Sequence, residues 1–177
     1  DPAGMSNYKR VRVAGGTYFF TLRLASDERS DLVQHVDVLR EAYAATTAEA
    51  PVRTEAIVVL PNHLHAVWTL PPGDDGYSER WRRIKARFSR GLSINRRSMS
   101  KERRREKGVW QRRFWEHAIR DEADFKAHLR YCWGNPVKHG YVARPADWAL
   151  SSIHRDIREG RIDAQWSGEE IDGTFGE

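Results

Sequence analysis

Two histidines separated by a single residue, His63 and His65, lie within an apolar run over residues 56–70. The Pro61-Asn62 pair interrupts this run with turn residues, so the pattern predicts two strands joined as a β-hairpin. Successive side chains of a strand point to opposite faces, which places both imidazoles on one face and the intervening apolar residues in the core. Two imidazoles on one face favour a shared metal ion over a purely structural role.

The rest of the chain mixes strand and helix patterns. Residues 17–24 are rich in β-branched and aromatic side chains, as strands are, and residues 31–46 repeat apolar side chains at helical spacing. The resulting order of strand, helix, two strands, helix, short strand and helix predicts an α+β domain of ferredoxin-like type, an antiparallel sheet with helices packed on it. The expected elements are 17–24, 31–46, 56–60, 63–70, a helix from an N-cap at Ser78 to residue 88, a strand at 114–120, and a helix from an N-cap at Asp121 to Asn135, ended by Pro136.

A length of 177 residues fits one domain with additions at its ends. We expect this domain at residues 5–155, after a cloning remnant at 1–4 that precedes Met5. Residues 156–177 carry seven acidic residues against two arginines and are expected to form an acidic tail. One hypothesis is that this tail folds onto basic parts of the protein when a nucleic-acid partner is absent.

Composition argues against a protein held together by cysteines and against a membrane protein. A single cysteine provides neither a disulfide framework nor a cysteine-ligated zinc site, which suits a cytoplasmic protein. The chain has no continuous apolar run of about 18 residues and no signal-peptide pattern, so we expect no membrane association.

Positive charge is concentrated in residues 79–113, which contain 15 Lys and Arg against 3 Glu, whereas the net charge of the whole chain is +5. Within this segment, residues 95–108 have almost no large apolar side chain and are expected to form a mobile basic loop. Aromatic residues interleave with the cations, a combination that favours nucleic-acid binding over an ordinary solvated surface. The candidate contacts are Arg80, Arg83 and Arg87 on one helix face, and Arg112 and Arg113 beside Trp115.

The predicted final helix has a polar stripe formed by Asp124, His128, Tyr131 and Asn135, which recur at helical spacing. The phenol of Tyr131 and the amide of Asn135 lie one turn apart on the same side, where they can act together on a site beside the sheet. The alternative is an ordinary amphipathic helix whose polar side faces solvent. His128, one turn before Tyr131, is a candidate modulator of the phenol or a structural histidine.

Four motifs follow one another along the chain: LPNHLH at 60–65, VWQRRFWEH at 109–117, YCWGNPVKHG at 131–140 and WALSS at 148–152. In this order they resemble the single-tyrosine HUH transposases, and most of all the REP-associated tyrosine transposases of bacteria, which handle repetitive extragenic palindromes (REPs). The resemblance extends from about Tyr8 to Arg155. The His-Leu-His element alone is common, but the ordered combination is specific.

The resemblance implies the HUH single-strand nuclease fold and assigns a role to each matching position. His63 and His65 match the metal-binding pair, and Tyr131 matches the nucleophile. Asn135 matches the position of a third metal ligand, which is glutamine in many insertion-sequence relatives. Mg²⁺ or Mn²⁺ is the expected cofactor, since the site lacks cysteine.

The implied function is metal-dependent nicking and strand transfer of single-stranded or hairpin DNA through a covalent 5′-phosphotyrosine. The resemblance also implies a bacterial protein of the cytoplasm, associated with the nucleoid, that acts as a monomer, a dimer being the alternative. Two other functions stay open. One is a hairpin-binding module whose catalysis is slow or lost, and the other is an unrelated metallohydrolase that uses His63 and His65.

Overall fold

The computed structural model describes residues 9–96, 108–169 and 175. Four strands form one antiparallel sheet in the order β2-β3-β1-β4, so the histidine-bearing strand β3 lies inside the sheet. The strands are β1 (Thr17–Arg23), β2 (Arg53–Val59), β3 (His63–Thr69) and β4 (Trp115–Ala118). The predicted hairpin and the predicted α+β fold of ferredoxin-like type are confirmed.

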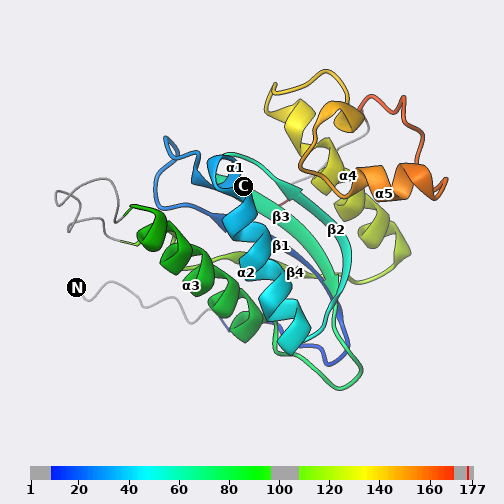
Figure 1. The fold of residues 1–177 in the computed structure, drawn as a ribbon. Coiled ribbons are helices and arrows are strands. Elements are labelled where there is room, and N and C mark those ends of the chain that lie inside the picture. The colour runs from blue at the N-terminus through cyan, green and yellow to red at the C-terminus, as the bar shows by residue number, and fades with distance from the viewer. Residues whose placement is uncertain (1–8, 97–107, 170–174, 176–177) are drawn as a thin grey trace, which may run out of the picture.

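Helices cover both faces of this sheet (Figure 1). Helices α2 and α3 lie side by side on one face, and α4 with α5 lies on the other. The helices are α1 (Asp31–Gln34), α2 (Val36–Glu49), α3 (Tyr77–Arg96), α4 (Glu122–Lys138), the 3₁₀ helix η1 (Pro145–Asp147) and α5 (Ile153–Arg158). The sheet therefore has two buried faces and two separate cores.

Alternation along β1 divides its aromatic side chains between the two cores. Phe20 joins the core under α2 and α3, where Trp68 and Trp81 stack with ring centroids 4.0 Å apart. Phe19 joins the core under α4 and packs in the same cluster as Tyr131. Full burial of such a side chain contributes about 2 kcal/mol by transfer from water. These contacts hold α4 against the face of the sheet that carries His63 and His65.

Two predicted helices differ from the observed ones. The helix expected at 31–46 is broken at His35, which has φ −121° and lies between α1 and α2. Leu32 on α1 and Leu39 on α2 are both buried in the core. The helix expected to begin after Ser78 begins at Tyr77 and extends to Arg96, so the expected loop at 95–108 begins inside α3. Residues 97–107 of that loop, and residues 1–4, lie outside the described ranges.

Helix α4 begins as predicted and ends later than predicted. The Asp121 side chain accepts a hydrogen bond from the backbone N–H of Asp124, which confirms the N-cap. Pro136 does not end the helix, which continues to Lys138, because a proline in the last turn removes only one backbone hydrogen bond. The N–H of His139 still donates to the carbonyl oxygen of Asn135 at 3.0 Å. The helix is therefore three residues longer than predicted.

The C-terminal boundary also differs from the expected one at residue 155, which falls inside α5. Asp156, expected to open an acidic tail, is buried and accepts hydrogen bonds from Arg155 at 3.0 Å and Arg161 at 2.8 Å. Trp166 packs against the core under α4. The beginning of the expected tail is thus part of the folded domain. Across the described ranges, no helix is both long and apolar enough to cross a membrane.

Candidate active site between strand β3 and helix α4

Strand β3 presents both histidines on the α4 face of the sheet, as the alternation predicts. The antiparallel register sets His65 opposite Thr21 and His63 opposite Arg23 on β1. Both histidines are buried, and their ring centroids lie 5.1 Å apart with the planes at 81°. Two imidazoles from one strand therefore meet beneath one helix.

One ring nitrogen of each histidine has a partner on the sheet side. His63 Nδ1 lies 2.7 Å from Asn62 Oδ1, and His65 Nδ1 lies 2.8 Å from Thr21 Oγ1. The Asn62 amide is oriented by its Nδ2, which donates to a backbone carbonyl. Because an amide oxygen only accepts, His63 Nδ1 donates this hydrogen bond, and in the neutral imidazole Nε2 is then the nitrogen that can bind a metal. Hydrogen bonds of this kind orient the histidines that bind metals in proteins.

Helix α4 adds a third donor atom. Asn135 is fully buried, and its Oδ1 lies 3.3 Å from His63 Nε2. A cation bound here would be held by both atoms and would take the place of the hydrogen bond between them. Imidazole nitrogen with amide oxygen is a donor set that suits Mn²⁺, and the oxygen also suits Mg²⁺. The three side chains therefore fit the cofactor that the sequence predicts.

The Tyr131 phenol lies beside this group. Tyr131 is one turn before Asn135 on α4, is 2% exposed, and has its ring centroid 5.3 Å from that of His65. Lys138 Nζ donates a hydrogen bond of 3.1 Å to the phenol oxygen. The polar stripe of α4 thus faces the sheet, and the alternative in which it faces solvent is wrong for His128, Tyr131 and Asn135, all of which are buried.

A second potential nucleophile, Cys132, is the immediate neighbour of Tyr131. Its side chain is fully buried and its Sγ contacts the backbone carbonyl of His65 at 3.6 Å. Burial raises the pKa of the Cys132 thiol well above its usual range. A thiol in this state is a poor nucleophile, so of these two neighbours the phenol is the better candidate.

The tyrosine is covered by an aromatic residue near the end of the chain. Phe175 stacks on the Tyr131 ring with centroids 4.2 Å apart and planes 17° apart. The same ring contacts His128 edge-on at 4.9 Å. The described part of the expected acidic tail therefore covers the phenol through an apolar contact, whereas the sequence suggested a contact between opposite charges.

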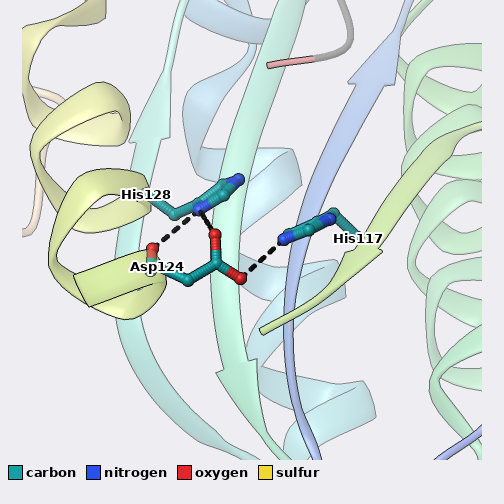
Figure 2. Close-up of side chains that lie close together, drawn as sticks. All are labelled: His117, Asp124 and His128. Carbon is teal, nitrogen blue, oxygen red and sulfur yellow. Dashed lines mark hydrogen bonds and ion pairs between the residues drawn. The ribbon is translucent and has the colours of Figure 1, made fainter. Parts of the chain in front are cut away.

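His128 belongs to a neighbouring group of side chains (Figure 2). Its Nδ1 donates to the backbone carbonyl of Asp124 at 2.8 Å, and its ring stacks on that of His117 with centroids 4.5 Å apart. The pKa of His128 is lowered, and burial is the largest of the effects that act on it. Phe19 and Phe175 each contact both His128 and Tyr131. The role of His128 as a modulator of the phenol stays a prediction.

Three of the predicted DNA contacts lie on the opposite face of the sheet. Arg80 is buried and donates to Asp74 at 2.7 Å and to the backbone carbonyls of residues 50 and 51. Its guanidinium therefore has a structural role. Arg83 and Arg87 pair with Glu49 of α2 at 3.3 Å and 2.6 Å. The predicted helix face therefore meets α2, on the side of the sheet away from the histidine pair, and these three arginines are engaged by other parts of the chain.

The other predicted contacts lie near the site. Arg112 and Arg113 are exposed and lead into β4, whose first residue, Trp115, is 46% exposed. The register places Trp115 opposite Thr21, which is itself opposite His65. Paired residues share a face, so Trp115 lies on the histidine face at the open edge of the sheet.

Sequence reasoning missed several residues around the site. Lys138 follows Tyr131 by seven residues, which is two helical turns, but the expected helix end at Pro136 removed it from consideration. His139, just beyond the helix, contacts the His63 ring edge-on at 5.0 Å. Arg23 is missed because its position depends on the register between β1 and β3. A prediction that extended the helix past Pro136 would have included Lys138. The position of Arg23 cannot be predicted from the residues next to it in the sequence.

No protein-family model matches the chain. The chain is 40% identical over 173 residues to the REP-associated tyrosine transposase of Escherichia coli (strain K12), an alignment that covers 98% of each protein. This chain belongs to the REP-associated tyrosine transposases. A relative in Haemophilus influenzae (strain ATCC 51907 / DSM 11121 / KW20 / Rd) is 45% identical over 166 residues, 93% of this chain and 94% of that one.

A solved structure of a REP-associated tyrosine transposase bound to a REP hairpin has the same fold. The two structures superpose with a TM-score of 0.87, at 40% sequence identity and 98% coverage of both chains. The family membership expected from the four motifs is therefore confirmed, and so is the HUH fold.

Proposed function

We propose that this REP-associated tyrosine transposase nicks and rejoins single-stranded DNA at REP-type hairpins, with Tyr131 as the nucleophile and with Mg²⁺ or Mn²⁺ held by His63, His65 and Asn135. The observation that carries the proposal is the meeting of one phenol, two imidazoles and one amide oxygen on a single face of the sheet. The hairpin bound in the relative's structure supports the choice of substrate.

The chemistry follows from these side chains. When bound, the cation offsets the negative charge of the scissile phosphate and orients it. The Tyr131 oxygen attacks phosphorus, one P–O bond forms and one breaks, and the 3′-oxygen leaves and takes up a proton. Lys138 donates to the phenol oxygen and stabilises negative charge there. Because one phosphodiester is exchanged for another, the strand can be rejoined by the reverse reaction without an energy source.

One assay separates this function from the two alternatives. Labelled hairpin DNA with a single-stranded flank is incubated with the protein and Mn²⁺, and the products are separated under denaturing conditions. A covalent DNA–protein adduct supports the transposase mechanism. Tight binding without an adduct indicates a hairpin-binding module, and cleavage without an adduct indicates a metallohydrolase.

We further propose that the active site is complete within one chain, in agreement with the expected monomer. The tyrosine that lies against His65 comes from the same chain, so a partner's helix is not needed to supply it. A cytoplasmic location at the nucleoid is part of the same proposal, since that is where the DNA substrate is found.

The DNA surface is proposed to lie along Arg112, Arg113 and Trp115, with Arg23 between it and the histidines. The double variant Arg112→Ala/Arg113→Ala is expected to bind single-stranded flanks more weakly and to reduce the slope of log K against log salt by about 1.4. Trp115→Ala is expected to lower affinity by roughly 5- to 100-fold, through lost base stacking, without changing that slope. Fluorescence anisotropy at several salt concentrations measures both quantities.

The matched control for this surface is Arg83→Ala/Arg87→Ala. It removes the same charge from the opposite face of the sheet, where both arginines pair with Glu49. We expect this variant to bind hairpin DNA as the parent chain does. Equal losses in the two double variants would contradict the proposed surface.

Phe175 is proposed to limit access to the nucleophile. Phe175→Ala removes a ring that stacks on Tyr131, a contact worth about 1 kcal/mol, so adduct formation is expected to be about fivefold faster. Phe175→Trp, which keeps a stacking ring, is the control and should retain the slower rate. An unchanged initial rate in Phe175→Ala, measured in the adduct assay, would refute this role.

A further inference from the structure

A second group of potential metal ligands lies outside the proposed active site. It consists of His117 on β4 with Asp124 and His128 on α4, and one ligand atom from each residue lies within 4.8 Å of the other two (Figure 2). His117 Nε2 is 2.8 Å from Asp124 Oδ2, and His128 Nδ1 is 3.2 Å from Asp124 Oδ1. The carboxylate is therefore placed between two imidazoles from different elements.

The three side chains are largely shielded from solvent. The exposed side-chain fractions are 26% for His117, 10% for Asp124 and 8% for His128. The backbone N–H of Arg120 donates to Asp124 Oδ2 at 2.9 Å and orients the carboxylate. Such outer contacts accompany the ligands of metal sites. A partly buried carboxylate that is oriented by the backbone and faces two imidazoles is a preformed set of donors.

We propose that His117, Asp124 and His128 bind a divalent transition-metal ion, with Zn²⁺ as the preferred occupant. Two imidazoles and one carboxylate form a common three-ligand set for zinc, with the fourth position left to water. Such a nitrogen-rich set favours Zn²⁺ over Mg²⁺ and Mn²⁺. The ligands of a tetrahedral zinc ion lie roughly 3.3 Å apart, so a modest rotation of the imidazoles closes the longest spacing.

Metal binding would replace two hydrogen bonds within the group. His117 Nε2 now contacts the Asp124 carboxylate, and His128 Nδ1 donates to the Asp124 backbone carbonyl. To bind through these nitrogens as neutral imidazoles, both rings would carry their proton on the other ring nitrogen, exchanged through solvent.

An ion at this position would connect β4 to α4, two elements separated by only three residues of the chain. β4 is a four-residue edge strand paired with β1 alone, and α4 carries Tyr131 one turn after His128. A metal ion that bridges His117 to α4 would fix the tyrosine helix against the open edge of the sheet. Its role would be structural, distinct from the cation proposed at His63, His65 and Asn135.

The test uses the full chain in a His63→Ala/His65→Ala background, with Zn²⁺ or Co²⁺ alone and no DNA. This background removes the proposed catalytic metal site, so the outcome is independent of nicking. We expect one Zn²⁺ per chain by calorimetry, a Co²⁺ spectrum typical of tetrahedral coordination, and a rise in the thermal midpoint of roughly 5–10 °C at a hundredfold excess over Kd.

Variants within this background identify the ligands. Adding His117→Phe keeps the ring stacked on His128 but removes the nitrogen, and is expected to weaken Zn²⁺ binding at least about tenfold. Asp124→Asn is the second variant, in case the first fails to fold. His35→Ala removes an imidazole outside both groups and should leave binding unchanged. The proposal is overturned if the background binds no Zn²⁺, or if both ligand variants bind it as the background does.

Discussion

Tyr131→Phe is expected to abolish the covalent DNA–protein adduct while hairpin binding is retained. The substitution removes only the oxygen that is proposed to attack phosphorus, so adduct formation should fall by at least about a thousandfold, as for other enzymes that lose their nucleophile. The remaining ring keeps its packing against Phe19 and His65, so the fold should be preserved. A denaturing gel with labelled DNA measures the adduct, and anisotropy measures binding.

The control for this result is Tyr141→Phe. Tyr141 is 47% exposed and contacts the Trp148 ring in a tilted arrangement beyond the end of α4. It presents the same chemical group in the same region without contact to the histidine pair, so its loss should leave adduct formation unchanged. If the adduct persists in Tyr131→Phe and disappears in Tyr141→Phe, the nucleophile is Tyr141 and the assignment of Tyr131 is wrong.

His65→Ala is expected to raise the Mn²⁺ concentration needed for half-maximal adduct formation by at least about a hundredfold. The substitution removes one of three proposed donors, whereas loss of a group that only orients a ligand costs about 10- to 100-fold. Thr21→Val is expected to raise this Mn²⁺ concentration by the smaller factor, because the Thr21 hydroxyl contacts His65 Nδ1 at 2.8 Å and only orients the ligand. The two variants should therefore form a graded series.

Thermal unfolding of both variants separates metal binding from folding, since His65 is fully buried. Saturating Mn²⁺ should restore part of the activity of Thr21→Val. Equal Mn²⁺ dependence in His65→Ala and the parent chain would contradict metal binding at the histidine pair, even if activity were lower.

Much of the site was accessible from the sequence because its signals are local. The alternation around His63 and His65 fixes a shared face as soon as the segment is a strand, and the spacing of Tyr131 and Asn135 fixes one side of a helix. The N-cap at Asp121 was equally clear because capping depends on residues close in sequence. The motifs then joined these separate elements into one expected site.

The errors arose where distant parts of the chain decide the outcome. Arg80, Arg83 and Arg87 share a helix face, but only the packing of α3 against α2 determines that this face meets Asp74 and Glu49. Charge in a sequence does not reveal whether it will be paired. The contact of Phe175 with Tyr131 joins residues far apart in the chain, and no local periodicity predicts it.

A tyrosine that lies against the histidines of its own chain sets the stoichiometry of the proposed reaction. One folded molecule holds one phenol beside one histidine pair, so in the proposed reaction it would carry a single severed 5′ terminus at a time. Moving a segment that has two boundaries then requires either two molecules brought together by the DNA or one molecule that cuts and reseals in succession. The hairpins at the boundaries, more than a protein interface, would then bring the two events together.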